Sequence, residues 1–138
     1  MLILTRYLEF DTSIGDVIDI TGKVAASIHE SGLQSGIAVV FVPGATGAVT
    51  TIEHEPGLVV DIRAALERIA PERIEYAHDQ RWGDGNGHSH IRASLIGPSL
   101  TVPFQESQPV LGTWQQIVFL ELDNRPRKRR IILQIFGE

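Results

Sequence analysis

The chain contains no cysteine among its 138 residues, and this lack removes several kinds of chemistry at once. Without cysteine there is no disulfide, no thiolate nucleophile and no cysteine-ligated metal. A bound metal must therefore be held by histidine, aspartate or glutamate. The sequence also lacks an apolar run of the roughly 18 residues that a membrane-spanning helix needs. Its N-terminus lacks the basic-then-apolar layout of a signal peptide, so we expect a cytoplasmic protein without membrane contact.

Basic residues are fewer than acidic ones, which gives the chain a net charge of −5. This balance gives no general attraction to nucleic acid, which we do not expect as a partner. A hydrophobic content of 43% with 21% charged residues is ordinary for a soluble globular protein. No internal repeat or low-complexity tract is visible. The length predicts a single domain over residues 1–138 that is large enough to bury a core.

The hydrophobic pattern changes from mixed to strand-rich along the chain. In the first half it predicts helices over residues 21–31 and 56–70, and strands over residues 2–10, 37–42 and 48–53. In the second half it predicts strands over residues 91–96, 99–104, 113–123 and 130–136. Two main helices beside runs of consecutive strands predict an α+β fold with a largely antiparallel sheet.

Three of the five histidines, His78, His88 and His90, lie within thirteen residues around a glycine-rich turn. If the segment from His88 is extended, the imidazoles of His88 and His90 point to one face of a strand. Neutral imidazole binds divalent metals, so we expect His78, His88 and His90 to form a metal site. Zinc suits these ligands better than magnesium, which prefers oxygen. The alternative is a set of surface histidines on a flexible turn.

Two carboxylates, one beside the histidines and one in a second polar cluster, are candidate catalytic residues. Asp84 could be a further ligand, could orient a histidine from the second shell, or could only cap the turn. Glu53 begins a Glu-His-Glu cluster where a strand passes into a helix, and a carboxylate there can act as ligand or general base. The alternative is a solvated junction in which Glu55 favours the helix N-terminus electrostatically.

Residues 112–116, Gly-Thr-Trp-Gln-Gln, begin one of the expected strands. Thr113 and Gln115 fall on one face of it and are candidates for hydrogen bonds to a ligand. Trp114 falls on the other face, where it would pack at a core edge or a subunit contact. The loop of residues 44–47 follows an apolar strand and could cradle an anion with backbone N–H groups, although a plain loop is the more ordinary interpretation.

The segment of residues 125–130 holds five of the twelve cations in six positions. Between two apolar strands, such a run predicts a solvated hairpin tip without a role in folding. On that interpretation, replacing Arg127 and Arg129 with glutamine leaves stability nearly unchanged. The alternatives are binding of phosphate and, less favoured, of nucleic acid.

Taken together, these motifs resemble the YjbQ family of small proteins, some of which are assigned as secondary thiamine-phosphate synthase. The matching residues are Tyr76, His78, His90, 93–103, 111–116 and 125–127. The chain departs from the family pattern at residues 44–47, where a His-Thr-Thr-Ala-Gly loop is usual. It also departs at His88, where aspartate is frequent.

The resemblance implies an α+β sandwich-like fold and a homotrimer with pockets near the subunit contacts. Trp82 and Trp114 flank the polar motifs and are compatible with such contacts, since aromatic residues are enriched at interface cores. The alternative is that both tryptophans fill the core of one chain.

The resemblance also implies a small phosphorylated ligand. The synthase reaction joins a pyrimidine diphosphate to a thiazole phosphate and releases pyrophosphate, which cationic groups would stabilise. The expected substrate-binding residues are Ser94, Thr113, Gln115, Arg127 and Arg129. Two alternatives remain open: zinc-assisted hydrolysis with Glu53 as base, and a metal- or phosphate-binding trimer without turnover.

Overall fold

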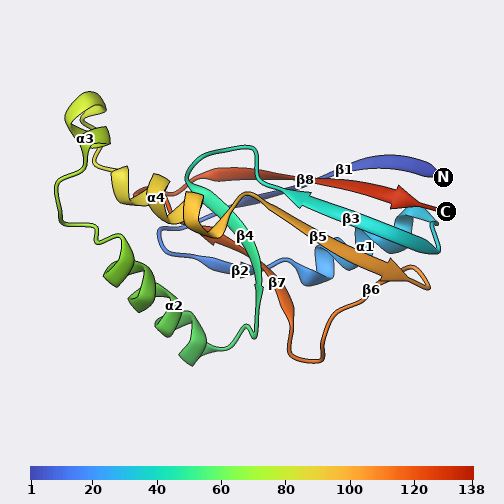
Figure 1. Cartoon of the computed structure of the whole chain (residues 1–138). Helices are drawn as coiled ribbons and strands as arrows, with labels where there is room; N and C mark the ends of the chain where they lie inside the picture. Colours follow the sequence, from blue (N-terminus) through green and yellow to red (C-terminus); the bar gives the residue numbers. More distant parts are fainter.

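Eight strands form two antiparallel sheets in the computed structural model, which describes all of residues 1–138 (Figure 1). The larger sheet has the strand order β1 (Leu2–Asp11), β8 (Lys128–Gly137), β3 (Ser35–Phe41), β5 (Ser99–Gln105) and β6 (Gln108–Pro109). The smaller sheet has the order β2 (Val17–Asp19), β7 (Gln116–Glu121) and β4 (Gly47–Ile52). The prediction of an α+β fold with antiparallel strands is confirmed.

Four helices cover parts of these sheets: α1 (Thr21–Ser31), α2 (Pro56–Ile69), α3 (Ala77–Trp82) and α4 (Gly87–Ile96). Helix α1 packs under the larger sheet, whereas α2, α3 and α4 gather at the end of the molecule away from the termini (Figure 1). Helix α2 starts as its sequence indicates, because Pro56 occupies its first turn and the Glu55 carboxylate accepts hydrogen bonds from two backbone N–H groups. No helix is long and apolar enough to cross a membrane.

Strand β7 lies between two hydrophobic cores. Ile117 and Phe119 face the main core of sixteen residues, which includes Val24 of α1 and Leu133 of β8. The alternate side chains Val118 and Leu120 belong to a second core of six residues. The members of that second core are Ala48, Leu66, Ala93, Val118, Leu120 and Leu122. Burial on both faces explains why this strand reads as a continuous apolar run.

Residues 91–96, which the hydrophobic pattern assigned to a strand, belong to α4 instead. The prediction is wrong because two large apolar side chains of this helix face solvent, whereas small and polar side chains face the core. Ile91 and Leu95 are exposed, while His88, Ser89 and Ala93 are buried. An inner face of small and polar residues gives no apolar stripe to recognise. The expected strand over residues 113–123 is also shorter, since residues 113 and 114 form a turn before β7.

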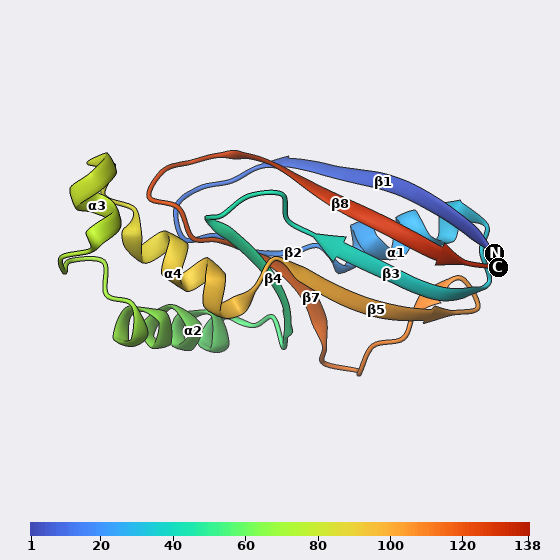
Figure 2. The same cartoon turned by 45° about the horizontal axis from the view of Figure 1, so that its top comes forward.

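No helix covers the outer face of the larger sheet (Figure 2). Several apolar side chains on this face are exposed. Cross-strand register places Ile3 and Ile37 on either side of Phe136, and places Tyr7 and Phe41 on either side of Ile132. Ile3, Tyr7, Ile37 and Phe41 are each at least 40% exposed. We refer to these six side chains as the outer apolar face.

Candidate metal centre

Glycines shape the corner at which α3 meets α4. Helix α3 ends at Gly83 with a φ of 72°, and Gly85 also has a positive φ. Gly87 packs so closely that an added Cβ would lie 2.5 Å from the Cβ of Tyr76. Its N–H donates a hydrogen bond of 2.8 Å to the Asp79 carboxylate. This close approach holds the beginning of α4 against α3.

His78 and His90 come together at this corner, with ring centroids 4.4 Å apart. The Nδ1 atom of His78 is buried and makes no hydrogen bond. It lies 3.6 Å from one carboxylate oxygen of Asp79 and 3.6 Å from one of Asp84. These separations are too long for hydrogen bonds. They match a shared metal, because two ligands on one tetrahedral zinc at about 2.1 Å lie about 3.4 Å apart.

Three side chains at this corner offer ligand atoms within 4.8 Å of one another: His78, Asp79 and Asp84. We call these three residues together with His90 the corner cluster. Asp79 was not singled out in the sequence, although an aspartate directly after a candidate ligand histidine could have drawn attention to it.

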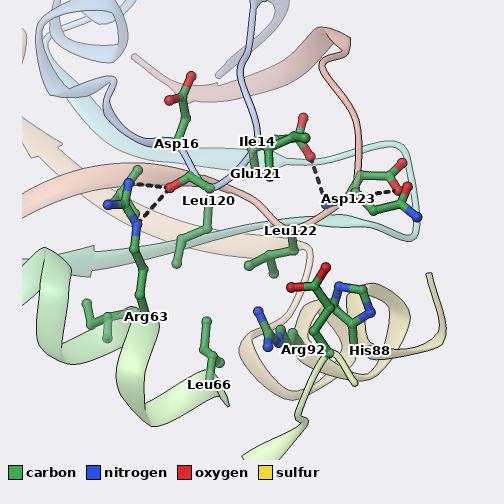
Figure 3. Close-up of a pocket in the computed structure, with 15 residues that line it drawn as sticks. Ile14, Asp16, Arg63, Leu66, His88, Arg92, Leu120, Glu121, Leu122 and Asp123 are labelled. Atoms are coloured by element: carbon green, nitrogen blue, oxygen red, sulfur yellow. Dashed lines mark hydrogen bonds between the residues drawn. The ribbon is translucent and has the colours of Figure 1, made fainter. Parts of the chain in front are cut away.

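His88 occupies the opposite side of α4 from His90. The expectation that both imidazoles share one face is wrong, because the segment is helical and residues two apart point about 200° away from each other. His88 is only 4% exposed and lies beside Tyr76, with ring centroids 6.5 Å apart. It lines a separate cavity beneath the helix (Figure 3).

Glu53 lies at the far end of the smaller sheet from the corner cluster. It is exposed directly after Ile52, which pairs with Gln116 at the start of β7. Asn86, beside the cluster, instead contacts Asp123 just beyond the other end of β7. Five residues of strand separate these two ends, or roughly 17 Å. Within one chain, Glu53 is therefore distant from His78.

The expected ligand-binding residues fall into two groups. Ser94 lies one turn after His90 on α4, is exposed, and donates a hydrogen bond to the His90 carbonyl. Thr113 is exposed in the turn before β7. The Gln115 amide donates to Thr51 Oγ1 and its oxygen accepts from the Gly112 N–H, each at 3.0 Å. Gln115 thus holds that turn in place.

Arg129 is buried instead of solvated, so the expected hairpin tip is wrong. Strands β7 and β8 belong to different sheets, and the segment between them crosses from one sheet to the other. The Arg129 side chain is 6% exposed and donates two hydrogen bonds to the fully buried Glu121 carboxylate and one to Thr46. Thr12 donates a further hydrogen bond to Glu121.

Arg127 forms a second ion pair in the same crossing, with Asp123. The Asp123 carboxylate also accepts hydrogen bonds from the Asn124 N–H, Asn86 and Thr46. Burial alone would raise the pKa of Asp123, but these hydrogen bonds and the one from Arg127 outweigh burial and lower the pKa.

The lowered pKa of Asp123 predicts an acid-sensitive contribution to stability. A carboxylate whose pKa is lower in the folded state stabilises the fold above its unfolded pKa, which is about 3.9. That contribution is lost as the pH falls through the folded pKa. The difference in unfolding free energy between the native chain and Asp123→Asn should therefore shrink from about pH 5 to pH 2. Urea unfolding at several pH values measures it, and a difference that stays constant would contradict the assignment.

The chain is similar to known proteins over nearly its whole length. Residues 6–138 match the family model described as UPF0047 protein YjbQ-like. A UPF0047 protein of Methanothermobacter thermautotrophicus is 40% identical, over 100% of this chain and 95% of that protein. A UPF0047 protein of Mycobacterium tuberculosis is 37% identical, over 97% of this chain and 98% of the relative.

Two solved structures share the fold over almost their whole length. A YbjQ-like protein of unknown function from Sulfolobus solfataricus superposes with a TM-score of 0.88 at 31% identity, covering 99% of this chain and 100% of that one. An uncharacterised YjbQ/UPF0047 protein from Clostridium acetobutylicum gives a TM-score of 0.87 at 36% identity, covering 95% and 99% respectively.

Proposed function

The chain belongs to the YjbQ-like UPF0047 family, and from that premise and the corner geometry we propose that it is a homotrimer with a zinc centre that hydrolyses a small phosphorylated molecule. One observation carries the metal assignment. The Nδ1 atom of His78 is buried, has no hydrogen bond, and lies 3.6 Å from two carboxylates. A shared cation satisfies all three groups, whereas in its absence the imidazole nitrogen is a buried polar atom without a partner.

The donor set fits a catalytic zinc site. His78, Asp79 and Asp84 offer ligand atoms within 4.8 Å of one another and would supply one imidazole and two carboxylates, which leaves a fourth position open beside the His90 ring. When bound in such a site, zinc acts as a Lewis acid and makes water nucleophilic near neutral pH. Asp79 is anchored by the Gly87 N–H, so its carboxylate is held in place at the metal position.

A phosphorylated substrate is what the family resemblance implies. The synthase reaction has less support than hydrolysis, because its two expected cations are engaged. Arg127 is paired with Asp123 and Arg129 with Glu121, so neither offers free positive charge to a leaving pyrophosphate. Glu53 can serve as the base only if a neighbouring copy of the chain brings it to the cluster.

Zinc titration of the metal-stripped protein tests the proposal. Competition with a chromophoric chelator should report one zinc per chain. Hydrolysis of p-nitrophenyl phosphate should then rise with zinc occupancy and saturate at that same ratio. Zinc binding without hydrolysis would leave a metal-binding trimer as the function. An absence of zinc binding would contradict the proposal as a whole.

The outer apolar face supports the homotrimer. Its side chains form two rows across three strands, with Thr5, Gln134 and Val39 in the row between them, and exposed apolar side chains gathered on one face mark an interaction surface. In a closed threefold ring each contact joins two different surfaces, so the outer apolar face would pack against another face of the neighbouring copy. Trp82 and Trp114 are also largely exposed, which argues against the alternative that they fill the monomer core.

A charge placed in the outer apolar face should dissociate the trimer. Three chains of 15.2 kDa give a particle of about 46 kDa, and Phe41→Asp should yield the 15.2 kDa species instead, because it buries an unpaired carboxylate at each contact. Val60→Asp, at an exposed apolar position on α2, is the matched control and should leave the mass unchanged. Light scattering measures both, and a Phe41→Asp protein that keeps the native mass would place the interface elsewhere.

A further inference from the structure

A cavity of about 130 Å³ lies beneath α4, on the side opposite the corner cluster (Figure 3). Its apolar wall comes from α2 and from the end of β7, namely from Ile62, Leu66, Leu120 and Leu122. His88 and Arg92 lie together on one side of it (Figure 3). An apolar pocket with a few polar groups at one end is the usual form of a small-molecule site.

Both polar groups have unused hydrogen-bonding capacity. The Nδ1 atom of His88 is buried and has no partner, although the residue is only 4% exposed. Arg92 donates from Nε to the Ala70 carbonyl and from Nη2 to Glu67, but its Nη1 makes no hydrogen bond. Native structures leave few buried groups such as His88 Nδ1 unsatisfied, so this atom needs an explanation.

The other charged groups around the cavity are occupied or solvated. Glu121 and Asp123 are neutralised by Arg129 and Arg127. Glu72 is exposed, so water screens its charge. Asp16 accepts a hydrogen bond from the Ser13 N–H, and Arg63 donates to the Gly15 carbonyl. Arg92 is paired through Nη2 with Glu67, which is more than half exposed, and this leaves its Nη1 group free.

We propose that this cavity binds a short-chain aliphatic monocarboxylate. Its carboxylate accepts hydrogen bonds from Arg92 Nη1 and from the N–H of His88 Nδ1, and its hydrocarbon tail packs against Ile62, Leu66 and Leu120. In the neutral tautomer with the proton on Nδ1, Nε2 faces the Ser89 hydroxyl at 3.5 Å as an acceptor. The volume equals that of about four waters, which suits an acid of four or five carbons. This site is separate from the zinc centre and does not depend on it.

Sodium butyrate is the probe that tests the proposal. Calorimetry and amide chemical shifts should report saturable binding with a Kd of about 1 mM, a typical affinity for so few heavy atoms. Butyramide keeps the shape but loses the charge, and should bind at least about tenfold more weakly. Butylammonium should not bind. Absence of saturable butyrate binding, or equal binding of butyramide, would overturn the carboxylate assignment.

Two variants and one control locate the site. Arg92→Gln should weaken butyrate binding at least about tenfold, because it removes the charged donor. Ile62→Phe should abolish binding by filling the cavity. This second variant keeps the proposal testable if Arg92→Gln does not fold. His78→Ala should lose zinc and keep butyrate binding, so failure of either proposal is visible without the other. Unchanged butyrate affinity in a folded Arg92→Gln or Ile62→Phe protein would place the ligand elsewhere.

Discussion

Replacing Arg129 with glutamine is expected to destabilise the protein by about 3–5 kcal/mol, because it leaves the carboxylate of Glu121 buried without its partner. The Glu121 side chain has no exposed surface, and Arg129 supplies two of its hydrogen bonds. Thr12 and the Asp123 N–H supply the others, and neither can neutralise the charge. Typical domains are stable by only about 5–15 kcal/mol, so the loss is a large fraction of the total.

Chemical denaturation at neutral pH measures this loss, with Arg130→Gln as the matched control. Arg130 lies next in sequence, but its ion pair with Glu9 is more than half exposed on both sides. Its removal should cost less than about 1 kcal/mol, as for other surface ion pairs. Equal denaturation midpoints for the two variants would mean that the buried ion pair contributes no more to the free energy of unfolding than an exposed one.

Replacing His78 with alanine should abolish stoichiometric zinc binding, because it removes the ligand atom that lies between the two carboxylates. Asp84→Asn should also lose most of the affinity, since a neutral amide is a weaker ligand than a carboxylate. Asp79→Asn should lose a similar share of the affinity, because Asp79 is the second carboxylate beside His78 Nδ1. Zinc competition assays on the three purified variants measure the order.

His88→Ala is the informative control for this series. A site built on all three histidines requires His88, whereas the helical geometry of α4 turns it away from His90. The variant should bind zinc as the native chain does. If it loses zinc while His78→Ala retains it, the corner cluster is not the metal centre.

The fold could be predicted from the sequence wherever hydrophobic residues follow the period of their element. Helix α2 and strand β3 carry such patterns, and both lie close to their expected positions. Helix α4 could not be recognised, because tertiary packing buries its polar and small residues and exposes Ile91 and Leu95. The order of helices and strands predicted the α+β class, with which the family resemblance agreed, but neither predicted this local conformation.

The site was predictable in part for a related reason. Clustering around a glycine turn drew attention to His78, His90 and Asp84, and the structure brings these three side chains to one corner, whereas their role in binding a metal stays a prediction. The role of the basic run was not predictable, since its partners Glu121 and Asp123 lie in an apolar strand and just after it. A run of cations gives no sign of which members are buried until the opposing carboxylates are located.

Crystallographic anomalous scattering at the zinc absorption edge tests the central claim most directly. Crystals of zinc-loaded protein should show one strong anomalous peak per chain, about 2.0–2.2 Å from a nitrogen atom of His78 and from one oxygen each of Asp79 and Asp84. A peak ligated by His88, or no peak at the α3–α4 corner in zinc-loaded crystals, would contradict the account.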